Sequence, residues 1–294
     1  MTVHPDGHQV HYEVHGDGDD VLLVLHGGPG MDRRYMLGLS ELAGPDLKVV
    51  LYDQLGGGQS DRPKDDSLWT MERFIDEVEA VRTGLDLGTV HLLGHSFGGM
   101  LALGYAVDHP EGLKSLIASH CLSSGGETVQ GCEAARSGLD AADYAVMHRH
   151  EAVGDLDDPA YVDLYQRVAA ASFRRNTPYN PETAVDELIE VVYPFSSEEG
   201  SDPARVMWGP NEYVTTGNLL DWDIRDRLGE IGCPTLVVGS WYDPLSPTFL
   251  RPMADRIPQA ELLIFGKSGH MILQERERDA YLGVVSDFVR RHSG

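Results

Sequence analysis

A serine enclosed by glycines is the most informative reactive group in this sequence. Gly94-His95-Ser96-Phe97-Gly98 matches the pattern Gly-x-Ser-x-Gly, with an apolar run, Val90–Leu93, before it and a helix-like segment, Met100–Val107, after it. A strand, a sharp turn and a helix in this order lift the serine Oγ above a sheet, next to a helix N-terminus that favours developing negative charge. We therefore predict that Ser96 is a nucleophile, and its residue type excludes an aspartate nucleophile.

A second glycine-rich loop offers backbone donors for an oxyanion. His26-Gly27-Gly28-Pro29-Gly30 comes directly after the apolar run Val21–Leu25. In this type of site, one N–H comes from such a loop and the other from the residue after the nucleophile. The predicted donors are Gly27 or Gly28, together with Phe97. An ordinary tight turn is the alternative, whereas a phosphate-binding loop is disfavoured because neither of its glycine patterns is present.

An aspartate and a histidine follow the last two strand-like runs of the chain. Asp243 ends the segment Thr235–Tyr242, and His270 follows Glu261–Phe265. We call the strand, sharp turn and helix around Ser96 the elbow. The order serine, aspartate, histidine along the chain is the one that accompanies this kind of elbow. We predict that Ser96 attacks, that His270 removes and returns the proton, and that Asp243 orients the imidazole. Weaker candidates for the acid lie in helix-like or loop stretches: Asp223, Asp226 and Asp255.

Alternating apolar runs and helix-like stretches predict the scaffold that positions these groups. The expected strands are His8–Val14, Val21–Leu25, Leu47–Tyr52, Val90–Leu93, Lys114–Ala118, Thr235–Val238 and Glu261–Phe265. Short, continuously apolar runs suit a mostly parallel sheet that is covered by helices on both faces. The expected helices are Met71–Leu85 with Thr70 as a possible N-cap, Met100–Val107 and Asp279–Arg291. This alternation of strands and helices predicts an α/β fold.

The middle of the chain has a different pattern, with helical segments and no strand-like runs. Strand-like runs stop near Leu122 and resume at Pro234, and three helical segments lie between them: Ala134–Arg149, Ala160–Arg174 and Pro181–Tyr193. We predict a core made of residues 1–121 and 221–294, with residues 122–220 inserted as a helical cap. Such an insertion covers the carboxyl edge of the sheet, where open α/β sheets bind ligands.

The composition limits the possible partners. With 23 Lys and Arg against 47 Asp and Glu, the chain cannot easily form the basic patch that nucleic acid requires. No run approaches the roughly 18 apolar residues of a membrane helix, and the first residues do not resemble a signal peptide. We expect a cytoplasmic protein with a small-molecule or short-peptide substrate and without a nucleic-acid or membrane partner. The sequence carries no indication of the oligomeric state.

Neither a metal nor a cofactor is expected. The three cysteines have no Cys-x-x-Cys spacing, which argues against a zinc site or structural disulfides. Cys121 lies just past a core strand and is interpreted as an inert buried thiol. Several histidines could suggest a metal: His4, His8, His11 and His15, or His148 and His150. A metal site is disfavoured, since His11 and His15 lie in or just beyond a strand-like segment without partner carboxylates at ligand spacing.

Four blocks of the sequence resemble the proline iminopeptidases of the α/β-hydrolase superfamily. They are the His26–Gly30 loop, Tyr52-Asp53-Gln54 with Gly58-Gln59-Ser60, the serine elbow, and Trp208-Gly209-Pro210-Asn211-Glu212-Tyr213. The resemblance spans almost the whole chain. It implies an α/β-hydrolase fold and release of an N-terminal residue, often proline, from short peptides or amides. It also implies that Glu212 binds the free amino group of the substrate, and Trp208 and Tyr213 are plausible lining residues.

One position departs from the pattern of this family. A second glutamate commonly follows the triad aspartate, but this chain has Pro244 there. Loss of one of two carboxylates would weaken ammonium binding, which leaves three hypotheses open. The first is an aminopeptidase or amino-acid amidase. The second is a related hydrolase or cyclase for an ester or amide of an amino-acid-derived metabolite. The third, a binding protein without catalysis, is disfavoured because all three triad residues are present.

Overall fold

Seven strands form one central sheet in the computed structural model, which describes residues 2–3, 7–136, 138–173, 202–211, 213–245 and 247–293. The order across the sheet is β3-β5-β4-β6-β7-β8-β9. The strands are β3 (Tyr12–His15), β4 (Asp20–Leu25), β5 (Leu47–Tyr52), β6 (Val90–His95), β7 (Leu113–Ser119), β8 (Thr235–Ser240) and β9 (Ala260–Phe265). Only β3 pairs antiparallel with its neighbour, and the other pairs are parallel. The predicted mostly parallel α/β fold is confirmed.

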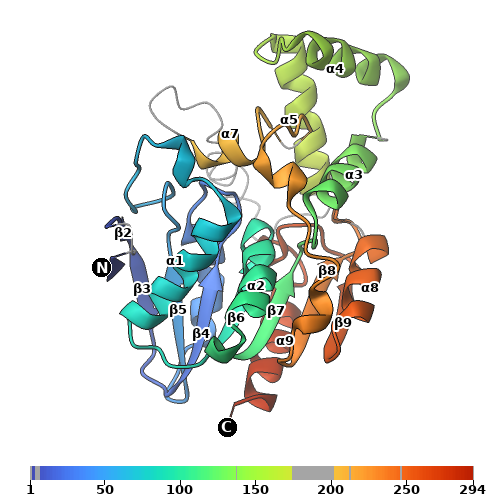
Figure 1. Cartoon of the computed structure of the whole chain (residues 1–294). Helices are drawn as coiled ribbons and strands as arrows, with labels where there is room; N and C mark the ends of the chain where they lie inside the picture. The colour runs from blue at the N-terminus through green and yellow to red at the C-terminus, as the bar shows by residue number, and fades with distance from the viewer. Residues whose placement is uncertain are drawn as a thin grey trace.

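Helices cover both faces of this sheet (Figure 1). The α-helices of the sheet layer are α1 (Met71–Gly84), α2 (Phe97–Asp108), α8 (Pro247–Arg256) and α9 (Arg278–Arg291). Short 3-10 helices include η1 (Arg33–Leu42), η4 (Asn218–Asp221) and η6 (Ile272–Gln274). In Figure 1, α1 and α2 lie in front of the sheet and α9 lies behind it.

Alternation along the strands divides the apolar core into two clusters. On β4, Leu23 belongs to the cluster that contains residues of α1 and α2, whereas Leu22 and Val24 belong to the one that contains residues of η1 and α9. Because successive side chains of a strand point to opposite faces, a run that is apolar at every position must be covered on both sides. The continuous apolar runs in the sequence are therefore explained by this arrangement of layers.

Between β7 and β8 the described chain contains α3 (Gly125–Arg136), α4 (Ala141–Val153), α5 (Pro159–Phe173) and the short α7 (Pro203–Met207). We call α3, α4 and α5 the cap helices. They lie beyond the carboxyl ends of the strands (Figure 1). The exact division into a core of residues 1–121 and 221–294 and a cap of residues 122–220 stays a prediction.

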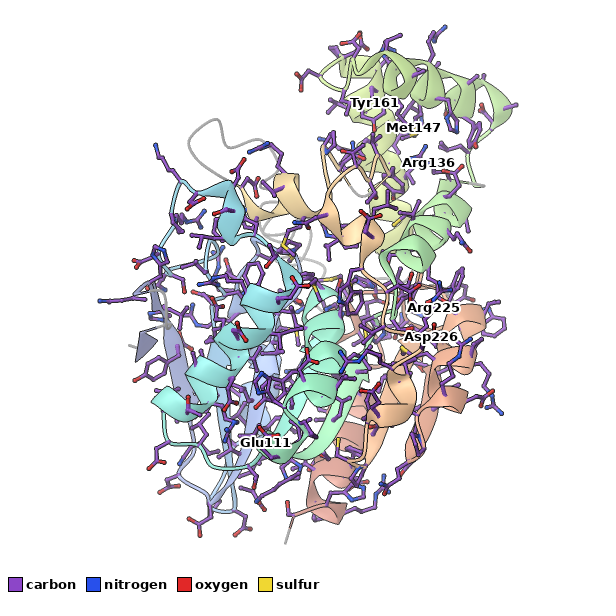
Figure 2. All side chains as sticks on the ribbon, in the orientation of Figure 1. Glu111, Arg136, Met147, Tyr161, Arg225 and Asp226 are labelled. Atoms are coloured by element: carbon purple, nitrogen blue, oxygen red, sulfur yellow. The ribbon has the colours of Figure 1, made fainter. Side chains whose placement is uncertain are left out.

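Two of the cap helices, α4 and α5, pack around a small cluster of their own. Its buried apolar members are Met147, Tyr161, Leu164 and Val168. Arg136, which is 1% exposed, lies beside this cluster and binds the Glu151 carboxylate at 2.8 Å (Figure 2). A buried guanidinium needs such a partner, because an unpaired charge inside a protein is strongly destabilising.

Several predicted elements differ from the observed ones. The expected helix Ala134–Arg149 is wrong, because α3 ends at Arg136 and α4 starts only at Ala141. Asp140 explains why α4 starts at Ala141, since its Oδ1 accepts the N–H groups of Ala142 and Asp143 and caps the helix. The expected strand His8–Val14 is divided between β2 (Gln9–Val10), which pairs with β1 (Thr2–Val3), and β3.

Other elements were not predicted or cannot be compared. The helices η1 and α8 have no counterpart among the expected elements, and α8 contains Pro252 in its interior. The predicted helix Pro181–Tyr193 lies outside the described residues. None of the described helices is long and apolar enough to cross a membrane.

Candidate active site

Ser96 lies at the turn between β6 and α2 in a conformation that L-residues rarely adopt. Its φ is 57° and its ψ is −125°, and it occupies the N-cap position of α2. Such strain persists only where the surroundings impose it, and it is common at functional sites. Ser96 donates its backbone N–H to the Ser119 carbonyl at 3.0 Å, which ties the turn to the end of β7.

Close backbone packing explains the glycines of this turn. A Cβ at Gly94 would overlap the Gly98 carbonyl oxygen, and one at Gly98 would overlap the Leu25 carbonyl oxygen. A Cβ at Gly99 would lie 2.5 Å from the Cys121 sulfur. The Gly-x-Ser-x-Gly-Gly pattern is thus required by sterics around a tight strand-to-helix turn.

Asp243 and His270 meet after the two adjacent strands β8 and β9. The His270 Nδ1 lies 3.1 Å from each carboxylate oxygen of Asp243, and both residues are buried. Asp243 is itself held because its Oδ1 accepts the Leu245 N–H at 2.8 Å. With Nδ1 donating to the carboxylate, neutral His270 has Nε2 as its proton acceptor.

His95, the residue before the nucleophile, connects the elbow to the His270 loop. The two imidazole rings lie 4.8 Å apart, and His95 Nε2 lies 2.8 Å from the His270 carbonyl oxygen. A carbonyl only accepts, so Nε2 carries the proton and Nδ1 accepts one from the Tyr35 hydroxyl at 3.0 Å. Burial lowers the pKa of His95 well below its usual value, which keeps the ring neutral for these bonds.

The His26–Gly30 loop lies directly against the nucleophile. A Cβ at Gly27 would lie 3.0 Å from the Ser96 Cβ. The Gly27 N–H donates to the Tyr35 hydroxyl at 2.5 Å and is therefore occupied. Among the described residues, no hydrogen-bond partner is found for the N–H of Gly28 or of Phe97. Of the predicted oxyanion donors, these two are the ones left available.

Buried polar contacts fix this loop from two other sides. The His26 ring accepts the Gln54 N–H at Nε2, over 2.9 Å, and donates from Nδ1 to the Gly27 carbonyl at 2.7 Å. Burial lowers the pKa of His26, in agreement with a neutral ring. The Trp208 indole N–H donates to the Gly28 carbonyl at 2.9 Å. The loop is therefore positioned by groups from three separate parts of the chain.

The predicted substrate-binding residues have different surroundings. Trp208 is 5% exposed and its polar atom is used by the Gly28 carbonyl. Tyr213 packs among the cap helices, with its ring centroid 4.9 Å from the Arg136 guanidinium and its carbonyl accepting from the same guanidinium at 2.6 Å. Glu212 lies outside the described residues.

The weaker candidates for the acid are engaged elsewhere. Asp223 forms an ion pair with Arg225, and Asp255 pairs with Arg251 at 3.1 Å. Figure 2 shows Asp226 beside Arg225, well away from the cap residues that it labels. Asp243 is the candidate that contacts His270. Cys121 is buried against Gly99, and burial raises the pKa of its thiol, as expected for an unreactive cysteine.

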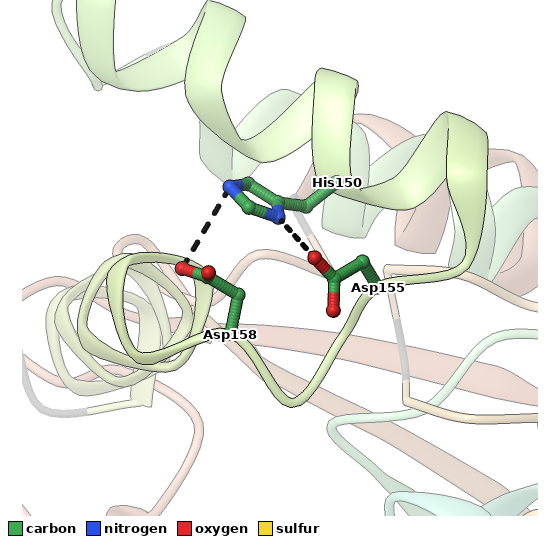
Figure 3. A group of neighbouring side chains, drawn as sticks. All are labelled: His150, Asp155 and Asp158. Carbon is green, nitrogen blue, oxygen red and sulfur yellow. Dashed lines mark ion pairs between the residues drawn. The ribbon is translucent and has the colours of Figure 1, made fainter.

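One group of described residues has donor atoms close enough to suggest a metal ion. His150, Asp155 and Asp158 lie at the turn between α4 and α5 (Figure 3). The two carboxylates face different ring nitrogens, at 3.4 Å from Nδ1 and 3.8 Å from Nε2. The arrangement fits ion pairs that hold the turn.

Two residues of the site were missed by the sequence analysis. Tyr35 connects Gly27 to His95, and Glu275 contacts the His270 loop through its buried carboxylate. Neither residue belongs to a motif with a known spacing. His95 was visible as the residue before the nucleophile, but the sequence could not show that its ring faces His270.

The fold and this site define an α/β-hydrolase. A family model described as the alpha/beta hydrolase fold matches residues 20–130. The proline iminopeptidase of Lactiplantibacillus plantarum is 36% identical to this chain, over 98% of the chain and 99% of the relative. The chain therefore belongs to the proline iminopeptidase family, and it is an enzyme of the hydrolase class.

Solved structures show the same relationship. The crystal structure of proline iminopeptidase from Mycobacterium smegmatis superposes with a TM-score of 0.81 at 31% identity, covering 99% of this chain and 98% of that one. The crystal structure of VinJ superposes with a TM-score of 0.85 at 28% identity, covering 100% of this chain and 98% of that one.

Proposed function

We propose that this enzyme releases an N-terminal residue, often proline, from short peptides or amino-acid amides through a Ser96 acyl-enzyme. The observation that carries the proposal is the buried Asp243–His270 pair, whose loop contacts the residue before a strained Ser96. Family membership supports the same reaction, since the relatives are named proline iminopeptidases.

In the proposed mechanism, His270 Nε2 takes the proton from the Ser96 hydroxyl as Oγ attacks the substrate carbonyl. The N–H groups of Gly28 and Phe97 stabilise the oxyanion, helped by the N-terminus of α2. His270 then protonates the leaving amine, and Asp243 stabilises the imidazolium. Water, activated by His270, releases the acyl group and restores Ser96.

Recognition of the free amino group is assigned to Glu212. A carboxylate in a partly dry pocket gives an ammonium both a counter-charge and a charge-assisted hydrogen bond. Pro244 stands where a second carboxylate is common in the family, so Glu212 would act without that partner. Pro244 also favours the second candidate, a related hydrolase or cyclase that acts on an ester or amide of an amino-acid-derived metabolite.

The two candidates differ in their need for a free amine. We would compare kcat/KM for L-proline p-nitroanilide and for its N-acetyl analogue, with Ser96→Ala as the blank. The first candidate predicts at least about a hundredfold preference for the free amine, a gap of ~2.7 kcal/mol. Glu212→Gln should remove this preference. Glu111→Gln is the matched control, because Glu111 is 71% exposed and lies at the opposite end of the molecule from the cap (Figure 2).

Other outcomes favour the second candidate or reject both. Equal cleavage of the blocked and free substrates would point to an ester or amide without a free amine. Cleavage that persists in Ser96→Ala would contradict the proposed nucleophile.

A further inference from the structure

A buried carboxylate holds the loop that carries His270. Glu275 follows η6 and is only 2% exposed. Its Oε2 accepts the Gly269 N–H at 2.6 Å, and its Oε1 accepts the Met271 N–H at 3.2 Å. One side chain therefore binds the residues on both sides of His270.

The peptide group after His270 is held at both of its polar atoms. Its N–H, from Met271, donates to Glu275, and its carbonyl, from His270, accepts from His95 Nε2 at 2.8 Å. A peptide bound on opposite sides has little freedom to rotate. The direction in which the imidazole leaves the backbone is fixed accordingly, as positioned catalytic groups require.

Glu275 also interacts electrostatically with the His270 imidazole. The pKa of Glu275 is raised to about 7, mainly by burial and to a smaller extent by the negative charge of Asp243. The two backbone N–H groups and a positive charge on His270 act in the opposite direction. Because such interactions are reciprocal, an ionised Glu275 favours the protonated form of His270.

Resting on the proposed role of His270, we propose that Glu275 is a positioning residue that holds the general base in place and stabilises its protonated form during catalysis. Among charged groups, Asp243 and His270 act on the pKa of Glu275, the first raising it and the second lowering it. Arg278, at the start of α9, forms ion pairs with Glu41 and Asp279.

A substrate-independent test uses diisopropyl fluorophosphate as the probe. In this reaction the Ser96 Oγ–P bond forms, the P–F bond breaks, the serine proton passes to His270, and fluoride leaves. The rate of labelling would be measured between pH 5 and 9 by intact mass. Labelling falls at low pH because His270 must be unprotonated to accept the proton.

Glu275→Gln removes the charge and replaces one accepting oxygen with an NH₂ group. We expect labelling at pH 8 to slow by about tenfold, because the imidazole loses its fixed position. We also expect the midpoint of the acid limb to move down by about half a pH unit, because the partial negative charge that Glu275 carries near pH 7 is lost. A purely structural role would leave that midpoint unchanged.

Glu277→Gln is the matched control on the same loop. The Glu277 Oε2 accepts the Lys267 N–H at 2.7 Å and the Ser268 hydroxyl at 2.8 Å, one step further from His270. This variant should keep the wild-type midpoint and a rate within about twofold of the wild type. Equal effects of the two substitutions, or a wild-type rate and midpoint in Glu275→Gln, would overturn the proposal.

If Glu275→Gln does not fold, a second variant distinguishes the effect of the carboxylate charge from the effect of side-chain length. Glu275→Asp keeps the charge but is one methylene shorter, so it should slow labelling and leave the midpoint near that of the wild type. A midpoint shift in this variant without a slower rate would also overturn the proposal. Labelling of Ser96→Ala at the wild-type rate would instead refute the proposed nucleophile, which distinguishes the two failures.

Discussion

The sheet layer and the cap helices are stabilised in different ways. Two large apolar clusters lie on the faces of the sheet, and the loops at its carboxyl end are fixed by buried backbone hydrogen bonds. In the described part of the cap, α4 and α5 share a cluster of four buried apolar residues, and ion pairs around Arg136 connect α3 to it. The chemistry of the site is therefore built on the rigid region, whereas the region next to Tyr213 depends on charge pairs.

Histidines illustrate the same contrast. Four histidines of the sheet layer are buried, and burial lowers their pKa values so that they serve as neutral hydrogen-bonding groups: His26, His91, His95 and His120. In the cap, His148 and His150 lie beside carboxylates and are partly exposed. The effect of a substitution should accordingly depend on the region in which it is made.

The largest expected effect is on the elbow. Gly94→Ala places a methyl group against the Gly98 carbonyl, which cannot move without opening the turn. We expect the free energy of unfolding to fall by more than about 3 kcal/mol, as measured by urea denaturation. Gly283→Ala is the control, because Gly283 is exposed on α9 with nothing within 4 Å of an added Cβ.

Gly283→Ala should stabilise the protein by about 0.5–1 kcal/mol, since alanine is the better helix former. If both variants changed the free energy of unfolding by similar amounts, the rigidity assigned to the elbow would be wrong.

A smaller effect is expected in the cap. Arg136→Met leaves Glu151 and the Tyr213 carbonyl without this partner, which should cost about 2–4 kcal/mol. Arg167→Met removes an exposed pair with Asp143 and should cost less than about 1 kcal/mol. Thermal unfolding would give these values.

Hydrogen exchange would show where the loss in Arg136→Met occurs. We expect faster exchange in α4 and α5, with the amides of β6 still protected, because these two helices have a separate small core. Equal loss of protection in β6 would show that the two regions unfold together and would remove the distinction between them.

The smallest effect concerns acid stability of the sheet layer. Burial lowers the pKa of His91 to about 4, and its Nδ1 lies 2.7 Å from the Ser115 hydroxyl. Because the unfolded chain binds a proton more readily between pH 6.5 and 4, stability is lost as the pH falls through this range. The loss attributed to His91 between pH 7 and pH 5 is about 2 kcal/mol.

His91→Gln keeps a side chain that can bond to Ser115 but cannot titrate. Between pH 7 and pH 5, its free energy of unfolding should therefore fall by about 2 kcal/mol less than that of the wild type. Parallel curves for the two proteins in urea titrations at pH 7, 6 and 5 would contradict the prediction.

Local patterns were sufficient for most of the sheet layer. Apolar runs marked β4, β5 and β6 because strands covered on both faces have few exposed positions. The run of β4 is continuous, whereas Lys48 and the buried His91 interrupt those of β5 and β6. The boundary between α3 and α4 was missed because the runs on both sides of it suit helices, and Gly138 and Asp140 between them were not interpreted as a helix end and a helix start. In the structure, Asp140 caps the start of α4. Residues such as Tyr35 were missed because a single hydrogen bond across the fold leaves no spacing in the sequence.

What the sequence alone determined was the fold class and the elbow around Ser96, because glycine spacing and strand order are local properties of the chain. The family resemblance, and with it the proposed substrate class, was also visible there. Only the tertiary structure decided that the Gly27 N–H is occupied by the Tyr35 hydroxyl, that Trp208 binds the Gly28 carbonyl, and that Glu275 binds the N–H groups on both sides of His270. Each of these depends on which distant groups share a buried space, and buried polar atoms must find partners wherever the fold places them.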